Sequence, residues 1–464
     1  MPDNVLILAG GQGKRMKVKS PKVLCEVLGI PMLQWVINSC EKSGLSNICV
    51  VKGYEAEQID AFLGDKYVTA LQKERLGTGH AVMQAAEFLN SNKDGNTLVL
   101  CGDAPFVDTE TITSALAFHN GNKNSVTVVT SEISNPTGYG RIIRNNNGIS
   151  AIVEQKDANS EQLLVNEVNS GCFWFKTQDL IDILFDIKSD NSQGEYYLTD
   201  CITLLIEKGK RADAFKSLNP VISLGANDRK GLLHLNDIAR EAVIDVHLEN
   251  GVEFTCLDGV VISPEVSIGV GTKIQQGVTL RGKTVIGENC NIGPNCIIEN
   301  TKIGNNVVLN NVQSYDAVLE NNISIGPFVQ LRPNTHILDG VKIGDFVEIK
   351  NSTIGKNTAV AHLTYVGDSD VGANVNFGCG AVTANHNGEC KFRTEICDNA
   401  FIGCNTNLVA PVKIGKSAYT AAGSTITKDV PDGALAIERG TVSIKDGFAT
   451  NRLAARNEKF SKLK

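Results

Sequence analysis

A repeat of six residues, which begins near Val260, constrains this 464-residue chain more than any other feature. An aliphatic residue followed by glycine recurs at positions 268, 286, 292, 303, 325, 343, 354, 371, 402 and 414. Several separations are multiples of six, among them those between Ile268 and Ile286 and between Ile402 and Ile414. This period, with an inward aliphatic side chain and a Gly or Asn at each corner, is typical of a triangular parallel β-helix with three hexads per coil. An ordinary sandwich of short strands would not keep the period.

An irregularity late in the repeat indicates a loop, and the repeat then ends. The step from Val371 to Ile402 is out of phase with the hexads by one position, so we expect a protruding loop over Cys379–Arg393 with residues 385–388 at its tip. Beyond Gly440 the repeat is lost, and residues 441–464 carry six basic and two acidic residues. This segment is predicted to be a frayed, solvated tail, with contact to a nucleotide or cofactor as the less favoured interpretation.

The first half of the chain alternates strand-like and helical stretches. In order these are a strand at Val5–Leu8, a helix near Met32–Glu41, a strand at Ile48–Val51, a helix at Gly79–Leu89 and a strand at Thr97–Leu100. The order predicts an α/β domain with a Rossmann-like, mostly parallel sheet that is covered by helices on both faces. Ligands of such sheets bind beyond the carboxyl ends of the strands, where residues 10–13 and 102–105 would lie.

An amphipathic helix is expected between the two halves. Its apolar stripe consists of Leu232, Leu235, Ile238, Ala239, Ala242 and Val243. We interpret this helix as a linker, so that the expected organisation is an α/β domain (1–228), a linker helix (229–248), a β-helical domain (249–440) and a tail (441–464).

The composition excludes several classes of protein. With 44 Lys+Arg against 51 Asp+Glu the net charge is −7, which argues against a general nucleic-acid surface. The first thirteen residues lack the charged start and apolar stretch of a signal peptide, and no apolar run could span a bilayer. The 13 cysteines show no C-x-x-C spacing, which argues against a disulfide framework or a zinc ribbon. We therefore expect a cytoplasmic protein that does not insert into membranes.

A glycine cluster follows the first strand. It comprises Gly10–Gly13 and precedes Lys14–Met16, and Ser20–Lys22 comes soon after. Glycines let backbone N–H groups approach a phosphate, and Arg15 and Lys22 could then neutralise a triphosphate. The spacing matches neither a Walker motif nor a dinucleotide fingerprint, and many βα turns carry glycines for steric reasons alone.

With its flanking residues this loop resembles the motif L-x-x-G-x-G-T-R-M, followed by P-K, of the sugar-1-phosphate nucleotidylyltransferases. Lys14 stands where that family usually has Thr. Further motifs follow in the order of the family: Gln72, Leu76–Gly79, Gly102–Pro105, Gly138–Arg141, Val153–Asp157, Asn169–Gly171, Gly194–Asp200 and Gly225–Asn227. With the β-helix behind them, residues 4–440 resemble the bacterial bifunctional N-acetylglucosamine-1-phosphate uridylyltransferases/glucosamine-1-phosphate N-acetyltransferases. That resemblance implies a left-handed β-helix of hexapeptide repeats and a homotrimer.

The resemblance implies that the first domain transfers a uridylyl group from UTP to N-acetylglucosamine-1-phosphate and releases pyrophosphate. Asp103 and Asn227 would bind Mg²⁺, and Arg15 and Lys22 would act as catalytic cations. On position alone, Asp103 could equally cap a turn. Gln72, Gly77 and Thr78 are implied to read the uracil, and Gly140, Glu154 and Asn169 to hold the N-acetylglucosamine. The full set implied to bind UTP or UDP-N-acetylglucosamine is Leu8, Ala9, Gly10, Gly11, Lys22, Gln72, Gly77, Thr78, Cys101, Gly102, Asp103, Gly140, Glu154, Asn169 and Asn227.

The resemblance implies a second reaction in the β-helix, in which acetyl-CoA acetylates glucosamine-1-phosphate. His362 would be the general base toward the 2-amino group; taken alone, a histidine on a strand is more often a surface residue. The residues implied to bind glucosamine-1-phosphate are Arg332, Lys350, Tyr365, Asn376 and Lys391. Those implied to contact acetyl-CoA are Cys379, Asn385, His386, Cys404, Ala422 and Arg439.

The sequence departs from the family in this second site. The family usually has Asn-Tyr where this chain has Asn385-His386, and it usually has Ala and Ser where Cys379 and Cys404 stand. These departures put the affinity for CoA and the acyl-group preference in question. Cys404 as an acyl-accepting nucleophile is the less favoured interpretation, because direct attack by the amine needs no acyl-enzyme.

Three other functions are considered. One is a single-activity sugar-1-phosphate nucleotidylyltransferase with a regulatory β-helix. Another is a non-catalytic binding subunit, as in a translation-factor exchange complex, but the joint presence of the expected catalytic and metal-binding residues opposes it. The third is a zinc site of His336, His362 and His386, as in β-helical carbonic anhydrases, although hexad counting does not place them at equivalent corners.

Overall fold

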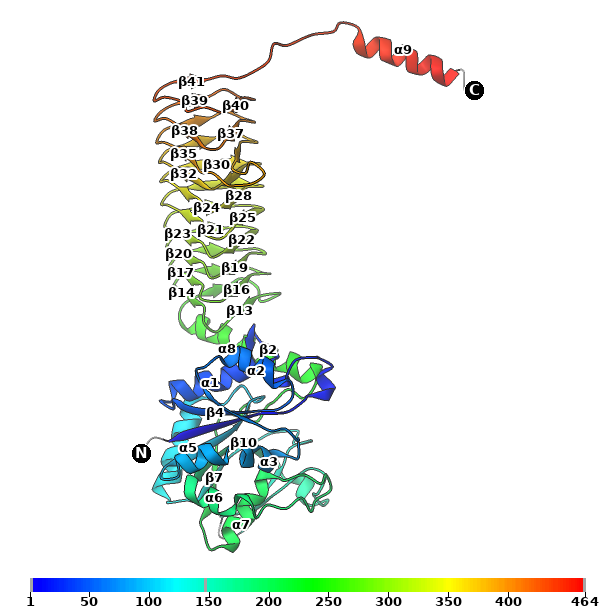
Figure 1. The fold of residues 1–464 in the computed structure, drawn as a ribbon, viewed down its shortest axis with the longest axis vertical. Coiled ribbons are helices and arrows are strands. Elements are labelled where there is room, and N and C mark those ends of the chain that lie inside the picture. The colour runs from blue at the N-terminus through cyan, green and yellow to red at the C-terminus, as the bar shows by residue number, and fades with distance from the viewer. Residues whose placement is uncertain (1–2, 146–147, 462–464) are drawn as a thin grey trace. The chain divides into compact units, whose positions relative to one another are not determined.

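The computed structural model describes residues 3–145 and 148–461, and the chain forms two compact units that meet between Ala242 and Val243 (Figure 1). This boundary lies inside helix α8 (Arg229–Glu249), the helix that the apolar stripe predicts. Leu235 and Ala239 of the stripe are buried, whereas Ala242 is exposed and the neighbouring Ile244 is buried in its place. The helix is therefore the segment through which one unit continues into the next.

The first unit contains a mixed, mostly parallel sheet, as the alternating pattern predicts. Its strands lie in the order β11-β7-β10-β6-β1-β4-β5, and β8 and β9 form a hairpin beside β10. The pairs β1·β4, β1·β6, β4·β5 and β7·β11 are parallel, and β10 is antiparallel to both of its neighbours. The bounds are β1 (Asn4–Ala9), β4 (Asn47–Lys52), β5 (Val68–Leu71), β6 (Asn96–Cys101), β7 (Val126–Glu132), β8 (Arg141–Asn145), β9 (Gly148–Val153), β10 (Glu167–Lys176) and β11 (Ala212–Lys216).

Helices cover both faces of this sheet because alternate strand residues point to opposite sides. In β1, Val5 and Ile7 belong to a core that includes residues of α1 (Met32–Lys42), α2 (Ala56–Leu63) and α5 (Thr109–Gly121). Leu6 belongs to the opposite core, with residues of α3, α4, α6 and α7. The bounds of that second set are α3 (Thr78–Gln84), α4 (Ala86–Ser91), α6 (Thr177–Leu184) and α7 (Cys201–Glu207).

Shorter elements complete the first unit. A small hairpin joins β2 (Glu26–Val27) to β3 (Ile30–Pro31). The single helix expected over Gly79–Leu89 is two helices, α3 and α4, that meet at Ala85. Single 3₁₀ turns lie at Lys14–Met16, Lys22–Leu24, Gln162–Leu164 and Leu198–Asp200.

The second unit is the left-handed parallel β-helix that the hexad pattern and the family resemblance predict (Figure 1). Over the described residues its short strands stack into three parallel sheets of 11, 10 and 9 strands. All ten aliphatic residues of the aliphatic–Gly pairs are buried in one continuous core, with exposed fractions between 0% and 9%. The six-residue period thus marks the inward-facing residue of each strand. Every third strand returns to the same sheet, so three hexads complete one coil.

The strands of the three sheets have the following bounds. The 11-stranded sheet contains β12 (Glu253–Phe254), β15 (Lys273–Ile274), β18 (Asn291–Ile292), β21 (Val308–Leu309), β24 (Ser324–Ile325), β27 (Lys342–Asp345), β30 (Ala359–His362), β33 (Asn376–Phe377), β36 (Phe401–Ile402), β39 (Tyr419–Thr420) and β41 (Leu435–Ala436). The 10-stranded sheet contains β13 (Val261–Ile262), β16 (Thr279–Arg281), β19 (Ile297–Glu299), β22 (Val312–Tyr315), β25 (Val329–Leu331), β28 (Glu348–Lys350), β31 (Tyr365–Gly367), β34 (Val382–Ala384), β37 (Asn407–Val409) and β40 (Thr425–Ile426). The 9-stranded sheet contains β14 (Ser267–Ile268), β17 (Val285–Ile286), β20 (Lys302–Ile303), β23 (Val318–Leu319), β26 (His336–Ile337), β29 (Thr353–Ile354), β32 (Ser369–Val371), β35 (Thr394–Ile396) and β38 (Val412–Ile414).

One insertion interrupts the coils, and it is shorter than predicted. Ile354 pairs with Val371 across an ordinary coil, whereas Val371 pairs with Ile396 across the longer coil that carries the insertion. Residues 379–384 remain in the coil, and the protruding segment is 385–393, closed by a bridge between His386 and Lys391. Asn385, expected at the tip, lies buried at the base of this loop.

The C-terminal segment differs from the frayed tail that its composition predicts. Helix α9 spans Phe448–Ser461, and its described side chains are exposed. Residues 462–464 of the expected tail lie outside the described part of the chain. Among the helices that the structure describes, none combines the length and the apolar character needed to cross a bilayer.

Candidate active sites

A cleft of about 450 Å³ opens in the first unit beside the glycine loop that follows β1. Eleven of the residues implied to bind the nucleotide, or to act on it, line this cleft. They are Leu8, Gly10, Gly11, Arg15, Lys22, Gln72, Gly77, Thr78, Cys101, Asp103 and Asn227. The loop, the α3 start and the end of β6 therefore meet at one place, as expected for the carboxyl ends of parallel strands.

Lys22 links the two expected metal ligands. Its ammonium forms an ion pair with a carboxylate oxygen of Asp103 and donates a hydrogen bond to Oδ1 of Asn227 at 2.7 Å. The Lys22 residue is only 8% exposed. Two oxygen donors thus converge on a cation in a partly buried position, which is the donor chemistry that Mg²⁺ prefers.

Gln72 is held against the glycine loop. It is 5% exposed, and its Nε2 donates a hydrogen bond to the carbonyl oxygen of Gly77 at 3.1 Å. A Cβ on Gly10 would lie 2.5 Å from Oε1 of Gln72, so only glycine permits this close approach. At Gly77 the φ of +109° and the adjacent backbone of Tyr196 impose a similar requirement.

The residues expected to hold the N-acetylglucosamine form a second group outside the cleft lining. The backbone N–H of Asn169 donates to the carbonyl oxygen of Gly140 at 2.9 Å. A Cβ on Gly140 would lie 3.2 Å from Oε1 of Glu154. Burial, followed by the charges of Asp157 and Asp200, raises the pKa of Glu154.

Two other predicted residues do not reach the cleft. Ala9 is 1% exposed and packs in the core beneath the sheet. Gly102 donates its N–H to the carbonyl oxygen of Leu8 at 3.0 Å and so supports the cleft from behind. Burial raises the pKa of Cys101, which does line the cleft, to about 12, so its thiol stays neutral.

Sequence reasoning assigned no role to three charged residues of the cleft, Lys14, Arg75 and Glu195. Arg75 lies between Gln72 and Gly77, with its guanidinium 6.0 Å from the centroid of the Tyr54 ring. Glu195 belongs to the motif Gly194–Asp200, which was recognised without a role for this carboxylate. Glu195 could have been found from its place within that motif, whereas Arg75 lies between two matched motifs and has no such signal.

A histidine–aspartate pair marks the β-helix. Nδ1 of His362, at the end of β30, lies 2.9 Å from Oδ1 of Asp345, its register partner one coil earlier. Because a carboxylate only accepts, Nδ1 carries a proton, and in the neutral imidazole Nε2 is left with its lone pair. The hydrogen bond from His362 lowers the pKa of Asp345, so this partner stays ionised. Asp345 was not predicted, although counting back one coil from His362 would have found it.

Four of the expected acetyl-transfer residues stack in one column with Asp345. The residue after each member of the column donates its backbone N–H to the carbonyl oxygen of the column member one coil below, at distances of 2.7–3.2 Å. These bonds place five residues at equivalent corner positions on successive coils: Asp345, His362, Cys379, Cys404 and Ala422. The predicted base and three predicted acetyl-CoA contacts therefore share one edge of the β-helix.

Cations gather on the neighbouring face. The side chains of Lys391 and then Arg332 lower the pKa of Lys350, because the three positive charges repel one another. Arg332 also forms an ion pair with Glu348 at 2.8 Å. Such a cluster suits a phosphate dianion, whose charge would relieve the repulsion.

The remaining sugar-phosphate and cofactor predictions have varied outcomes. Tyr365 lies on β31 and its hydroxyl is 3.5 Å from Nδ2 of Asn385. Asn376 pairs in register with Ala359, which begins the strand that ends at His362. His386 is exposed on the inserted loop, and Arg439 is exposed beyond β41. Among the described residues, neither of them contacts the column.

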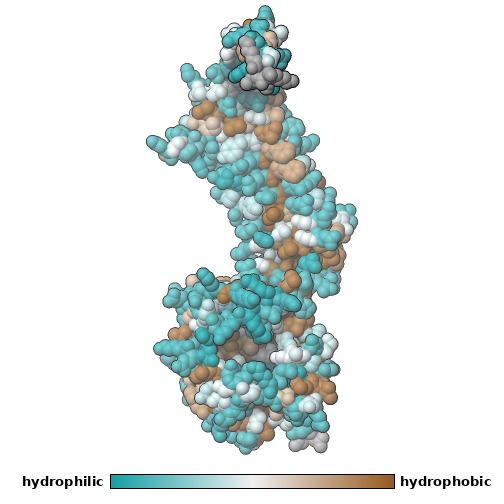
Figure 2. Space-filling model, turned by 90° about the vertical axis from the view of Figure 1, so that its right-hand side faces the viewer, coloured by the Kyte–Doolittle hydropathy of each residue, from teal (hydrophilic) through white to brown (hydrophobic). Residues whose placement is uncertain are grey.

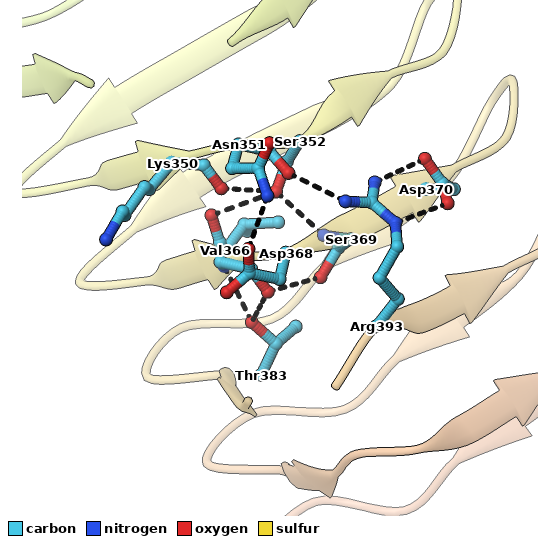
Figure 3. Close-up of polar contacts among 10 residues, drawn as sticks. Lys350, Asn351, Ser352, Val366, Asp368, Ser369, Asp370, Thr383 and Arg393 are labelled. Atoms are coloured by element: carbon cyan, nitrogen blue, oxygen red, sulfur yellow. Dashed lines mark hydrogen bonds and ion pairs between the residues drawn. The ribbon is translucent and has the colours of Figure 1, made fainter. Parts of the chain in front are cut away.

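A network of polar contacts not foreseen from the sequence anchors the inserted loop (Figure 3). The carboxylate of Asp368 accepts a hydrogen bond from the side-chain amide of Asn351. It accepts a second one from the side-chain amide of Asn385. Arg393 closes the loop with a bidentate ion pair to Asp370 and a hydrogen bond to the carbonyl oxygen of Asn351 at 3.2 Å.

The structure disfavours the zinc alternative. His336 lies on β26, in a different sheet from His362, and pairs with Glu320 at 3.2 Å. Within residues 3–145 and 148–461, no group of three or more His, Cys, Asp or Glu side chains is arranged to hold a metal ion.

Comparisons with known proteins place the chain in a family. Residues 4–219 match the nucleotidyl transferase family. Three proteins named bifunctional protein GlmU are similar along almost their whole lengths. The one from Geobacillus sp. strain WCH70 is 45% identical over 96% of each chain, that from Acetivibrio thermocellus 44% over 98% of each, and that from Caldanaerobacter subterraneus 46% over 97% of this chain and 98% of the relative. This chain therefore belongs to the bifunctional GlmU family of transferases, which have a uridylyltransferase and an acetyltransferase activity.

Proposed function

We propose that the chain makes UDP-N-acetylglucosamine, a cell-wall precursor, in two steps at two separate sites. In the β-helix it acetylates glucosamine-1-phosphate with acetyl-CoA, and in the first unit it joins the product to UTP and releases pyrophosphate. The observation that carries the proposal is the corner column, in which a histidine oriented by Asp345 lies at one edge with three expected acetyl-CoA contacts. A regulatory β-helix has no need of such an arrangement.

In the acetyl-transfer step, the 2-amino nitrogen of glucosamine-1-phosphate attacks the thioester carbonyl of acetyl-CoA. The nitrogen–carbon bond forms, the carbon–sulfur bond breaks, and Nε2 of His362 takes the proton from the nitrogen. That proton is then available to the departing CoA thiolate. Asp345 accepts the Nδ1 proton, and so holds the imidazole in the orientation and tautomer that the base needs.

The cation cluster positions the acceptor. Lys350, Lys391 and Arg332 would bind the phosphate, and Tyr365 and Asn376 would contact the sugar. Holding the phosphate fixes the amine relative to the thioester, and this positioning supplies much of the rate acceleration of a bimolecular transfer.

In the uridylyl-transfer step, a phosphate oxygen of N-acetylglucosamine-1-phosphate attacks the α-phosphorus of UTP, and the bond to pyrophosphate breaks. Arg15 and Lys22 neutralise the triphosphate, and Gln72, held against Gly10 and Gly77, reads the uracil. The protein need supply little beyond positioning and positive charge.

Mg²⁺ suits this site, since the oxygens of Asp103 and Asn227 already converge on the ammonium of Lys22. These two residues would hold the ion, and it would neutralise charge that develops on the phosphate oxygens. Lys22 would then be free to contact a phosphate.

We further propose a cytoplasmic homotrimer. All 13 cysteines are free thiols, in keeping with a reducing compartment. Hydrophobic patches lie along the β-helical unit in Figure 2. Among the exposed hydrophobic residues of this unit are Phe328 and Phe346, whose stacked rings have centroids 5.4 Å apart and which are more than half exposed. Exposed aromatic pairs of this kind favour burial against another copy of the chain.

The rival function is a nucleotidylyltransferase whose β-helix only regulates it. Separate assays on the purified full chain decide between them: free CoA released from acetyl-CoA and glucosamine-1-phosphate, and pyrophosphate released from UTP and N-acetylglucosamine-1-phosphate. Both products are expected. Release of pyrophosphate without any free CoA would favour the rival.

A further inference from the structure

We propose that Asp368 is a positioning residue for acetyl transfer, which fixes the side-chain amide of Asn385 so that its carbonyl oxygen faces the bound ligand. The inference rests on the proposed function, because Asn385 is one of the residues expected to contact acetyl-CoA. It adds a residue to which neither the family motifs nor the corner column assigns a role.

Asp368 takes a position that asparagine occupies on the two preceding coils. Backbone hydrogen bonds place Asn334, Asn351 and Asp368 at equivalent corners on successive coils. All three have left-handed backbone conformations, with φ of +63°, +46° and +48°. Asparagine and aspartate both tolerate this conformation, so the corner itself does not require a carboxylate. Aspartate appears on the coil just before the inserted loop.

The hydrogen bonds of Asp368 explain why a carboxylate is needed. One oxygen accepts from Nδ2 of Asn351, and the other accepts from Nδ2 of Asn385 (Figure 3 shows Asp368 and Asn351). Asp368 is 6% exposed. Burial alone would raise its pKa, but the hydrogen bonds from Asn351 and Asn385 lower it, and the carboxyl stays ionised.

A carboxylate can accept from both amides, whereas an amide in its place must donate to one of them. Asparagine at position 368 would therefore require the side-chain amide of either Asn351 or Asn385 to flip. Aspartate leaves a single arrangement, in which both neighbours present their N–H groups to it.

The orientation of Asn385 follows. One N–H of its amide is used by Asp368, and Nδ2 is also 3.5 Å from the hydroxyl of Tyr365. No hydrogen bond from any described residue reaches its Oδ1. The free group is thus a carbonyl oxygen, and its ligand partner is an N–H or O–H donor. Two sources fit this chemistry: an amide N–H of the pantetheine arm of CoA, and the amine or a hydroxyl of glucosamine-1-phosphate.

A double-mutant cycle in the full-length protein tests the proposal. Acetyl-CoA and glucosamine-1-phosphate are titrated separately by calorimetry against wild type, Asn385→Ala, Asp368→Asn and the double variant. Asn385→Ala is expected to weaken one ligand by about ten-fold, the worth of one hydrogen bond, and the affected ligand identifies the donor. Asp368→Asn should weaken the binding of the same ligand, and it should cause no further loss of affinity when residue 385 is already Ala.

Other outcomes of the cycle overturn the proposal. If Asp368→Asn costs as much in the Asn385→Ala background as in wild type, Asp368 acts through its charge on Lys350 and Lys391. If Asn385→Ala weakens neither ligand, Oδ1 has no partner in the site.

An exchange of residues provides the matched control. In Asn351→Asp combined with Asp368→Asn, the amide at 368 can donate to the new carboxylate at 351 and accept from Asn385, so the orientation of Asn385 is restored at unchanged net charge. We expect affinity within about three-fold of wild type, and a loss as large as that of Asp368→Asn alone contradicts the proposal. Unchanged uridylyl transfer and an unchanged circular dichroism spectrum show that each variant is folded. Wild type that binds both ligands but releases no CoA would refute the proposed function, whereas these affinities still report on Asn385.

Discussion

Asp345 and His362 face each other across one turn of the β-helix, with Oδ1 of the carboxylate 2.9 Å from Nδ1 of the imidazole. The two residues are paired in register on β27 and β30, so the solenoid itself sets their separation. A general base oriented by rigid strands loses little conformational entropy when the substrate binds, because its rotamer is already selected.

Asp345→Asn should lower kcat for acetyl transfer by roughly 10- to 100-fold, since general base catalysis is worth about 10² to 10⁴ and the imidazole would be kept but poorly oriented. KM for glucosamine-1-phosphate should change little. Steady-state assays of CoA release measure both constants. Asp339→Asn is the matched control, because Asp339 bonds Lys356 and Asn321 instead, and it should leave kcat within about two-fold of wild type. Equal losses in both variants would mean that Asp345 has only a structural role.

The affinity for glucosamine-1-phosphate should fall as the pH rises, and it should fall at a lower pH than if the phosphate were bound by a lysine of ordinary pKa. Lys391 and Arg332 lower the pKa of Lys350 below its usual 10.5, and the charged form is the one that binds phosphate. Affinity is therefore lost as pH rises through this lowered pKa. Lys391→Met removes one repelling charge, so binding should be weaker near pH 8 but should persist to higher pH. Calorimetric titrations between pH 8 and 11 measure this, and an unshifted pH profile in Lys391→Met would contradict the account.

Gly10→Ala should raise KM for UTP by about ten-fold, because the new Cβ would displace Gln72 and remove one uracil contact. Gly121→Ala is the control, since a Cβ there meets no atom within 4 Å. Pyrophosphate release over a range of UTP concentrations gives the KM for UTP of both variants. A Gly10→Ala enzyme with the KM of wild type would show that Gln72 does not read the base.

Cys404→Ala should retain acetyl transfer within about three-fold of wild type, because the amine attacks acetyl-CoA directly and no acyl-enzyme is needed. Cys404 is exposed in the corner column, so its alkylation should nevertheless block the site by bulk. Iodoacetamide is thus expected to inhibit CoA release in wild type more than in Cys404→Ala. Complete loss of acetyl transfer in Cys404→Ala would instead identify this thiol as the nucleophile.

The sequence predicts repeating features better than single contacts. A buried aliphatic residue every six positions leaves the β-helix no alternative packing, so its core could be identified residue by residue. The glycine loop and Lys22 could be identified because their chemistry is local in sequence. Asp345 and Asp368 have no such local signal, since each acts on a neighbour one coil away and the coils differ in length even outside the insertion. Counting back one coil finds Asp345 only after His362 has been taken as the base.

Other differences have similar causes. The break between α3 and α4 at Ala85 has no Gly or Pro to mark it in the sequence. Asn385 was placed at a loop tip by counting hexads, but its hydrogen bond to Asp368 holds it at the base. Arg75 lines the cleft but lies outside the matched motifs, so nothing local in the sequence marks it.

The central claim is that the two reactions use separate groups, and two variants assayed for both products test it most directly. His362→Ala should reduce CoA release to background, because it removes the base, and should leave pyrophosphate release within about two-fold of wild type. Asp103→Ala should abolish pyrophosphate release and leave CoA release normal, because it removes the partner of Lys22 and an expected metal ligand. Loss of both activities from either substitution, in protein that remains folded, would contradict the division into two sites.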